Sequence, residues 1–393
     1  MIPVKTLIID ANGFGWRAIV SDTVFRGVLR LSERRIPSQL MRCSFVNRIL
    51  QDRYRNLGYI ADWRSAFRDD PRLNVTVCNI CNLVEFYGTL REIREYDLII
   101  ILHSATGDSI DILNFAAHAL RRRRAPIMLF LGNEYSLLQE KVHFIQEASV
   151  DFICSQLPHA AAAWLYTHCT AARILLAPHA LNSAVYTPQF AARRSVDIGF
   201  RGALYHNIIG DMERTLLIDY VRQGRGYAAR FSRDIGTDTM PQDGWLYFLR
   251  SCKGIVGAES GSYYLQRTGS AVECARKLLQ GTPSASFDHV YQTCFACARD
   301  FVNGKAVSSR HFEPIGTQTC QVLIEGFYNG ILHANEHYIA VKRDLSNVDE
   351  ALQAFDDVGH RQRIAVNAFD HVMSAHTYRH RVVDLLQRVG IAS

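Results

Sequence analysis

The sequence predicts an α/β protein made of two Rossmann-like domains, and three observations support this fold class. The chain has 393 residues, a length that suits two domains of ordinary size. Short apolar segments alternate with amphipathic segments along the whole chain. Several of the short segments contain almost no polar residue, which is typical of strands in a parallel sheet that is covered by helices on both faces.

In the first half, six segments have the composition of short buried strands. They are residues 6–9, 74–77, 97–102, 126–131, 151–154 and 173–177. Amphipathic patterns of helical period separate several of them, at residues 109–124, 137–148 and 159–168. Strand, helix and strand in this order predict a doubly wound parallel sheet.

The second half repeats the pattern after residues 182–190, which have no clear period and predict a linker. Its expected strands are residues 195–200, 227–231, 254–257, 321–324 and 337–341, with helices at 210–223, near 245–249 and from 361 to 389. We therefore expect an N-terminal domain at 1–182, a linker at 183–194, a second domain at 195–365, and C-terminal helices at 366–393 that can return to the N-terminal domain. Two such domains place a ligand cleft between them, at the carboxyl ends of the strands.

The composition is that of an ordinary globular protein, with 48% hydrophobic and 21% charged residues. No apolar run reaches the roughly 18–20 residues that cross a bilayer. Residues 1–10 form a short strand pattern that ends in an acid, and they lack the long apolar core of a signal peptide. We therefore expect a cytoplasmic protein that can also lie at the inner face of a membrane.

Ten cysteines in a chain of this length do not indicate a disulfide scaffold. Two pairs, Cys78/Cys81 and Cys294/Cys297, have a spacing that occurs in zinc sites. The pairs fall in different predicted domains, and the second pair lies in an expected helix. Buried free thiols are therefore the favoured interpretation, and we expect no metal site.

The formal net charge is +6, and the basic residues are unevenly spread. Eleven arginines fall between Arg26 and Arg72, which predicts a face for an anionic partner such as a phospholipid surface, a lipid-phosphate carrier or an acidic glycan. The run Arg121–Arg124 closes an expected helix, where cations suit the helix dipole. The basic segment lacks the interleaved aromatic residues of an RNA-binding module, so we expect no nucleic acid partner.

Residues 309–317, with the sequence Ser-Arg-His-Phe-Glu-Pro-Ile-Gly-Thr, are the strongest functional motif. Ser308 and Ser309 can cap a helix, and Arg310 and Glu313 then share one helix face. In a site for a sugar nucleotide, Arg310 would meet phosphate and Glu313 would meet sugar hydroxyls; the alternative is an ordinary surface ion pair. Gly316 and Thr317 follow and permit close backbone approach to a ligand.

Further candidates for contacts with a nucleotide surround this motif. Lys305 and Arg201 are candidate phosphate ligands, and Arg214 is a weaker one; the alternative for each is a solvated surface charge. The turn at residues 257–262, which contains Glu259 and Ser260, combines glycines and hydroxyls after a strand, as nucleotide-binding turns do. Its alternative is a plain turn with a capping serine.

The N-terminal domain offers a second group of candidate residues. Gly13 and Gly15 follow the first strand and would let the backbone approach a phosphate or an acceptor. His103 and Asp108 flank the loop after the strand at 97–102, where a histidine suits the role of general base. His179 precedes the linker and could contact the donor from there. The alternative for His103 is a hydrogen-bonded structural role.

Six segments carry a resemblance to a known family. They are residues 133–135, 177–182, 197–202, 257–262, 309–317 and 346–350. With them the chain resembles the bacterial group 1 glycosyltransferases of the GT-B fold, close to the spore-maturation-protein-like branch used in surface polysaccharide assembly. The resemblance implies a nucleotide-sugar donor, a glycan or lipid-linked acceptor, and a hexosyltransferase type of activity. Independently of the resemblance, Glu134 has a standing similar to that of His103, because it follows the next strand along the chain.

The resemblance implies specific roles for two positions. Many retaining members carry Glu-x7-Glu, in which the first glutamate contacts the donor sugar and the second contacts the ribose. Glu313 matches the first position, and Gln321 stands at the second, so the stereochemical outcome stays open. The sequence lacks the Asp-x-Asp motif of metal-dependent transferases. We therefore expect a metal-independent enzyme without a cofactor, in which the nucleotide-sugar is a substrate.

Two other functions fit the same fold. The first is a non-catalytic scaffold that binds carbohydrate or anions. The second is an isomerase or a phosphorylase, although no lysine stands out for binding pyridoxal phosphate. The fold class alone does not choose among these functions.

Overall fold

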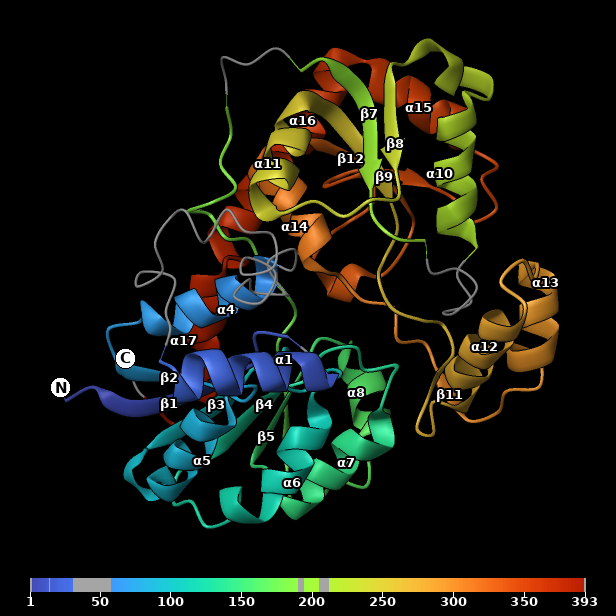
Figure 1. The fold of residues 1–393 in the computed structure, drawn as a ribbon. Helices are drawn as coiled ribbons and strands as arrows, with labels where there is room; N and C mark the ends of the chain where they lie inside the picture. The colour runs from blue at the N-terminus through green and yellow to red at the C-terminus, as the bar shows by residue number, and fades with distance from the viewer. Residues whose placement is uncertain (1, 14, 31–57, 190–193, 205–211, 392–393) are drawn as a thin grey trace. The chain divides into compact units, whose positions relative to one another are not determined.

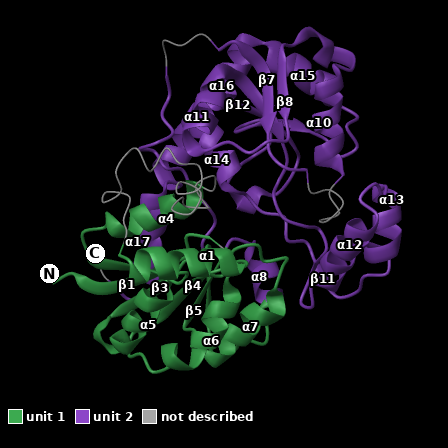
Figure 2. Cartoon of the chain, in the orientation of Figure 1, with its two compact units in different colours: residues 1–155, 166–175, 392–393 green, residues 156–165, 176–391 purple. Residues whose placement is uncertain are grey.

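A computed structural model describes residues 2–13, 15–30, 58–189, 194–204 and 212–391. The chain forms two compact units, coloured separately in Figure 2. Unit 1 holds residues 1–155 and 166–175, and unit 2 holds residues 156–165 and 176–391, so the division falls before the boundary expected at residue 182. Each unit is built on one sheet of parallel strands, and the predicted fold class is confirmed. No helix among the described residues is long and apolar enough to cross a membrane.

Unit 1 contains a six-stranded sheet in the order β2-β1-β3-β4-β5-β6 (Figure 1). Its strands are β1 (Val4–Asp10), β2 (Leu73–Asn79), β3 (Leu98–Ile101), β4 (Ile127–Phe130), β5 (Phe152–Ser155) and β6 (Arg173–Leu176). The neighbours from β2 to β5 pair in parallel. All residues of β3 and β4 are buried, which explains why these strands are apolar throughout.

The winding direction of unit 1 reverses between β1 and β3, because the chain passes from β1 to β2 on one side and then to β3 on the other. Right-handed crossovers place helices on both faces of such a sheet. The helices are α1 (Gly15–Ser21), its π-helical continuation η1 (Asp22–Val28), α4 (Gly58–Arg68), α5 (Leu83–Arg91), η3 (Ile93–Glu95), α6 (Ile110–Leu120) and α7 (Leu138–Glu147). The loops after β1 and β3 flank the reversal point, where open α/β sheets bind ligands.

Unit 2 contains a five-stranded parallel sheet in the order β13-β12-β9-β7-β8. Its strands are β7 (Val196–Arg201), β8 (Arg233–Gly236), β9 (Cys252–Gly257), β12 (Cys320–Ile324) and β13 (Ile339–Val341). The winding direction reverses between β7 and β9. Unit 2 therefore repeats the doubly wound arrangement of unit 1.

The unit 2 sheet has a hydrophobic core on each face. Val322 and Ile324 of β12 join one core with residues of α10 and α15, and Leu323 joins the other with residues of α11 and α14. Alternate strand residues point to opposite faces, so a strand between two cores is apolar at most positions. The exception in β12 is Gln321, whose buried amide donates to the carbonyl oxygen of His311 at 3.0 Å. The helices of unit 2 are α8 (His159–Leu165), α10 (Glu213–Gln223), α11 (Gln242–Ser251), α14 (Ser309–Gly316), α15 (Val348–Asp356), α16 (Val358–Ala375) and α17 (Tyr378–Arg388), with short turns η4 (Gly226–Arg230) and η6 (Tyr328–Gly330).

An insertion lies between β9 and α14 and carries its own elements. They are the antiparallel strands β10 (Leu265–Gln266) and β11 (Phe301–Val302), the helices α12 (Ser270–Gly281) and α13 (Phe287–Val290), and the π-helical turn η5 (Tyr291–Phe295). A disulfide joins Cys274 to Cys294, so the expectation of a free thiol at Cys294 is wrong. Cys297 is free but exposed, whereas Cys78 and Cys81 are buried free thiols as predicted. The partner Cys274 comes close to Cys294 only in the folded insertion, which spacing along the chain does not reveal.

Two local expectations need correction. The segment expected as a strand at 227–231 instead begins in the turn η4, and the strand β8 starts at Arg233. Gly224 and Gly226 have φ of +65° and +48°, so the chain turns here before it can extend. In the run Arg121–Arg124, which follows α6, Arg123 is not solvated: its guanidinium pairs with Asp151 at 2.7 Å, and its side chain is 7% exposed.

Replacement of Gly254 in β9 tests the tight packing of the unit 2 sheet. A Cβ at this position would overlap the ring of Phe355, so Gly254→Ala should lower the free energy of unfolding by about 1–3 kcal/mol. Gly244 in α11 is the matched control, because its Cβ would meet no atom closer than 3.6 Å. Gly244→Ala should raise the free energy of unfolding by up to about 1 kcal/mol. Urea denaturation of both variants measures these free energies of unfolding. Equal values for the two variants would contradict the close contact between Gly254 and Phe355.

Candidate functional site

A neutral histidine in the first turn of α14 fixes the position of this helix. The backbone N–H of Ser308 donates to Nδ1 of His311 at 2.9 Å, which leaves the proton on Nε2. This Nε2 then donates to the carbonyl oxygen of Ala258 at 3.0 Å. Burial lowers the pKa of His311 to about 4, so the ring is uncharged near neutral pH. His311 thereby ties the start of α14 to the turn after β9, and the predicted cap at Ser308 is part of this arrangement.

Arg310 and Glu313 both contact Trp245 of α11. The Nε1 of Trp245 donates to Oε2 of the buried Glu313 at 2.6 Å, and the guanidinium of Arg310 lies 4.2 Å from the centre of the indole ring. The two residues do not form the surface ion pair that the sequence left as an alternative. Arg310 Nη1 is buried, and no hydrogen-bond acceptor for it lies among the described residues. The arrangement therefore presents a cation and a carboxylate side by side.

The turn after β9 lies beside the segment that leads into α14. The backbones of Ser260 and Ala306 exchange two hydrogen bonds of 2.9 Å, and Ser260 Oγ donates to Ser308 Oγ at 2.9 Å. Glu259 is buried and accepts a bond of 2.6 Å from the backbone N–H of Tyr328. Burial raises the pKa of Glu259, while neighbouring N–H groups and the charges of Lys305 and Arg343 act in the opposite direction. The predicted residues of this turn are thus assembled next to α14.

Two cations lie against Tyr263, close to this turn. Lys305 Nζ is 4.6 Å and Arg343 Cζ is 5.0 Å from the centre of the ring, and the Tyr263 hydroxyl donates to Glu213 at 2.6 Å. The sequence indicated Lys305 but missed Arg343 and Trp245. The available signal for Arg343 is its position directly after the strand β13, where parallel sheets collect functional side chains. Trp245 lies within a helix and offers no such signal.

Other candidates for donor contacts have partners within unit 2. Arg201 pairs with Asp234 and Asp238 and lies 4.7 Å from the centre of the Phe248 ring. Gly316 permits close approach as expected, but the approaching groups belong to this chain: a Cβ there would lie 2.7 Å from the carbonyl oxygen of Tyr186. These contacts hold the segments of unit 2 together.

Three more predicted residues are almost fully buried. Thr317 Oγ1 donates to the carbonyl oxygen of Pro314 at 3.0 Å, and the Gln321 amide donates to the carbonyl oxygen of His311 at 3.0 Å. His179 lies 3.5 Å from the Tyr378 hydroxyl, and burial lowers its pKa to about 3. Gln321 is in the interior of β12, so its amide supports α14 from inside the sheet.

In unit 1, the predicted residues lie in the two loops that flank the reversal point. The carbonyl oxygen of Gly13 accepts a bond of 3.0 Å from Ser109 Oγ, which links the loop after β1 to the start of α6. Gly15 has a φ of +73° with open space where a Cβ would lie. His103 is buried among aromatic rings, and Asp108 is exposed.

The sequence missed a buried acid at the end of β1. Asp10 is 2% exposed and pairs with Arg64 at 2.6 Å; it also accepts a hydrogen bond from Ser104. Glu134, after β4, accepts bonds from Ser155 at 2.9 Å and from the Tyr166 hydroxyl at 2.5 Å. The signal for Asp10 was its position at the carboxyl end of an apolar strand.

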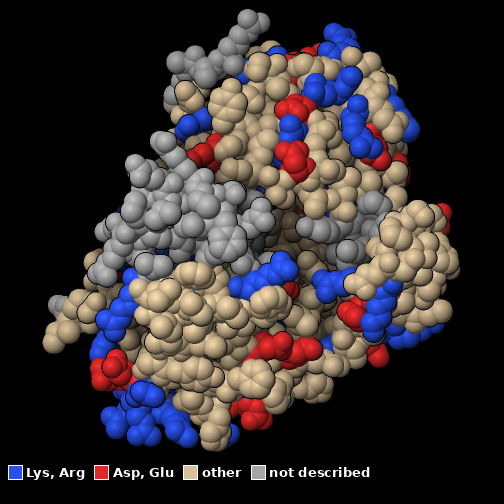
Figure 3. Space-filling model, in the orientation of Figure 1, with Lys and Arg blue, Asp and Glu red and all other residues tan. Residues whose placement is uncertain are grey.

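The arginine-rich segment at 26–72 is described only in part, because residues 31–57 lie outside the described residues. Four of its described arginines pair with aspartates: Arg26 with Asp22, Arg64 with Asp10, Arg68 with Asp69, and Arg72 with Asp70. On the face drawn in Figure 3, basic and acidic side chains of the described residues are interspersed. The described arginines are therefore largely neutralised locally.

Comparison with solved structures shows which fold this is. The chain superposes on an α-glucosyltransferase in complex with UDP-glucose and DNA containing an abasic site, with a TM-score of 0.56 and 10% identity over 98% of this chain and 99% of that one. A second structure, an α-glucosyltransferase in complex with UDP and a 13-mer DNA, gives a TM-score of 0.53 and 9% identity over the same shares. The fold is GT-B. At such low identity, the similarity concerns the fold alone.

Comparison of the sequence with models of protein families gives a match over a shorter part of the chain. A family model described as glycosyl transferase-like matches residues 281–387, which include α14, β12 and β13. A search of curated protein sequences finds no match. The matched region contains Arg310, Glu313 and Arg343, and it ends one residue before the end of α17.

The expectation that nucleic acid is excluded as a partner is wrong. Both glucosyltransferases described above were solved with DNA, and they share the GT-B fold of this chain. The expectation relied on the missing signature of an RNA-binding module. A transferase that modifies DNA does not need that signature, because the nucleic acid is the acceptor of its reaction.

Buried neutral histidines predict a loss of stability in acid. The folded-state pKa lies at about 3 for His179 and about 4 for His311, His337 and His376, below the ordinary value of 6.5. The unfolded chain therefore binds more protons between these values, and stability falls as the pH drops from about 6.5 toward 4. Each fully buried histidine contributes a slope that rises to about 1.4 kcal/mol per pH unit once the pH is well below 6.5.

Urea denaturation at pH 7.5, 6.5 and 5.5 measures this slope. His311→Gln should reduce the slope by the contribution of one histidine. This holds even if the substitution also changes the free energy of unfolding at pH 7.5. The exposed His143 of α7 is the control, and His143→Gln should leave the slope unchanged. An unaltered slope in His311→Gln would show that this ring takes up its proton in the folded protein as readily as in the unfolded chain.

Proposed function

We propose that this protein is a glycosyltransferase that uses a UDP-sugar donor, which binds to unit 2 at the carboxyl ends of its strands. The observation that carries the proposal is the joint contact of Arg310 and Glu313 with Trp245. A sugar nucleotide needs a cation for its diphosphate and a carboxylate that accepts hydrogen bonds from a diol. The GT-B fold and the glycosyl transferase-like match support the same function.

The diphosphate would lie between the start of α14 and the cations near Tyr263. Arg310 has a buried Nη1 available, and Lys305 and Arg343 both lie against the Tyr263 ring. The start of α14 adds a partial positive charge from its backbone N–H groups. These groups would stabilise the charge that develops on the leaving UDP.

The role of Glu313 follows from the position of Gln321 inside β12. A residue in the sheet interior is poorly placed to contact a ribose, so Gln321 does not suit the second position of the Glu-x7-Glu pattern. The pattern fits better when Glu313 is its second residue. It then begins at Lys305, and Glu313 takes the second position, which contacts the ribose in the enzymes that this sequence resembles. The Trp245 N–H occupies Oε2 of Glu313, and Oε1 would accept the ribose hydroxyls.

Unit 1 would bind the acceptor through the loops after β1 and β3. Gly13 and Gly15 belong to the first loop, and His103 and Asp108 to the second. Asp108 is exposed, and His103 lies among aromatic rings. In this proposal one of the two removes the proton from the acceptor hydroxyl.

The finer parts of the proposal concern the acceptor and the setting. The resemblance to the spore-maturation-protein-like branch supports transfer of a hexose to a glycan or lipid-linked acceptor in surface polysaccharide assembly, in the cytoplasm and without a metal ion. A panel that contains glycan, lipid-linked and DNA acceptors, each tested with and without EDTA, would decide among acceptors. A protein that binds UDP but transfers to none of them would be a non-catalytic binding module.

Replacement of Glu313 tests the donor site. Glu313→Ala should lower kcat/KM for a UDP-sugar by roughly 10- to 100-fold, the scale for loss of a hydrogen bond to a charged group. Glu350→Gln, on the exposed surface of α15, is the control and should behave like the wild type. Calorimetry with UDP alone then separates two roles: weaker UDP binding supports the ribose contact, and unchanged binding would move Glu313 to the sugar. Normal kinetics would refute the site.

Replacement of Trp245 tests the support of that carboxylate. Trp245→Phe keeps an aromatic ring for Arg310 but removes the N–H that donates to Glu313. A hydrogen bond to a charged group is worth about 1.5–3 kcal/mol, so UDP affinity should fall by about 10- to 100-fold. Trp164→Phe is the matched control, because its ring lies against Arg267 instead. Equal UDP affinities in the two variants would show that the indole N–H does not orient Glu313.

A further inference from the structure

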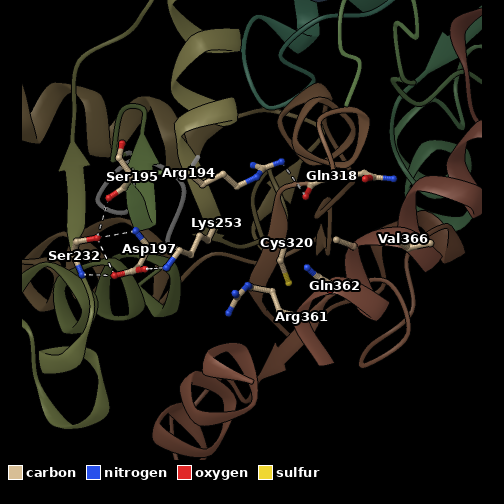
Figure 4. A pocket seen from close by; sticks show the side chains of 11 residues that line it. Arg194, Ser195, Asp197, Ser232, Lys253, Gln318, Cys320, Arg361, Gln362 and Val366 are labelled. Carbon is tan, nitrogen blue, oxygen red and sulfur yellow. Dashed lines mark hydrogen bonds and ion pairs between the residues drawn. The ribbon is translucent and has the colours of Figure 1, made fainter. Parts of the chain in front are cut away.

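A pocket of about 920 Å³ lies at the amino ends of β7, β9 and β12 in unit 2 (Figure 4). The proposed donor site lies at the opposite edge, because Glu259 and Arg343 follow the carboxyl ends of β9 and β13. The size falls within the roughly 300–1,000 Å³ of small-molecule sites. The pocket is therefore separate from the proposed donor site, and the proposed transferase activity makes no use of it.

The pocket carries excess positive charge. Three cations, Arg194, Lys253 and Arg361, line it together with one carboxylate, Asp197. Both oxygens of Asp197 are already occupied: Oδ1 by Lys253 Nζ at 2.6 Å, and Oδ2 by the backbone and hydroxyl of Ser232 at 2.7 and 2.8 Å. Asp197 thus balances Lys253, and the two arginines lack a carboxylate of their own among the described residues.

Arg194 is held by neutral groups only. Its guanidinium donates to the carbonyl oxygens of Cys252 and Thr317 at 2.5 and 2.6 Å and to the hydroxyl of Thr319 at 2.7 Å. These acceptors fix the side chain but do not cancel its charge. Burial, together with the nearby charge of Arg361, lowers the pKa of Arg194. Both arginines line the same pocket.

Arg361 offers free donors to the pocket. Its Nη1 donates to the carbonyl oxygens of Phe355 and Asp356 at 2.6 and 3.3 Å, and its guanidinium lies 5.1 Å from the centre of the Phe355 ring. Nε and Nη2 have no acceptor among the described residues. Two free nitrogens of one guanidinium match two oxygens of a phosphate group. Gln362 and Ser195 add neutral hydrogen-bonding groups to the lining.

We propose that this pocket binds a phosphorylated small molecule, with its phosphate held by Arg361 beside Arg194 and Lys253. A phosphate would supply the negative charge that the two arginines lack among the described residues. The volume leaves space for more than a bare ion, which favours a phosphorylated sugar or nucleotide as the ligand. Arg194 also touches the carbonyl oxygens of Leu249 in α11 and of Thr317 after α14, so the ligand would lie next to the ends of the helices that carry Trp245 and Glu313.

The test uses Val366, a lining residue that is 42% exposed and so tolerates a polar side chain. Val366→Glu places a carboxylate in the pocket, and Val366→Gln is its uncharged match. Arg361→Gln removes the proposed ligand, and Arg363→Gln removes the same charge from an exposed position outside the lining of the pocket, on the same helix. Binding of pyrophosphate, glucose 6-phosphate and AMP to the full chain is measured by calorimetry at low ionic strength.

At least one of these probes should bind the wild type. Val366→Glu and Arg361→Gln should weaken that binding at least about tenfold, while Val366→Gln and Arg363→Gln retain it. Arg310→Gln should also retain it, which separates this pocket from the donor site. The proposal is overturned if none of the probes binds, if Val366→Glu and Val366→Gln bind equally, or if Arg310→Gln abolishes the binding.

Discussion

Parallel pairing of the strands is the constraint on which the structure of both units depends. When strands run in one direction, all segments that follow them collect at one edge of the sheet and all segments that precede them collect at the other. Helices cover both faces, so the strands are apolar and the polar chemistry moves to the edges. Unit 2 follows this division: Glu259 and Arg343 lie at one edge, and Arg194 and Lys253 lie at the other.

The candidate donor site depends on neutral contacts for its geometry. His311 is uncharged and joins α14 to the turn after β9, and Gly316 packs against Tyr186 at the other end of the helix. Trp245 then orients Glu313 and Arg310 without pairing them with each other. An ion pair between the two would consume the charges that a ligand needs, whereas an indole can hold a carboxylate and a guanidinium at once. The side chains of Arg310 and Glu313 are thus held in place, and their charges stay available to a ligand.

The similarity to glucosyltransferases of 9–10% identity has a physical explanation. A doubly wound sheet needs apolar strands, amphipathic helices and turns, and many sequences meet these needs. The polar residues at the sheet edges are under no such constraint from the fold. Function must therefore be argued from Arg310, Glu313 and their neighbours, because the architecture accommodates different acceptors.

The sequence by itself determined the two parallel sheets and the helix that carries Arg310 and Glu313. Local period and composition encode which faces are buried, as the wholly apolar residues 98–101, 127–130 and 322–324 illustrate. The tertiary structure alone decided which side chains meet. Trp245 reaches Glu313 across 68 positions, and Arg201 is engaged by Asp234 and Asp238. Such contacts depend on how segments distant in the sequence pack against one another in the folded chain, and no local sequence pattern encodes that packing.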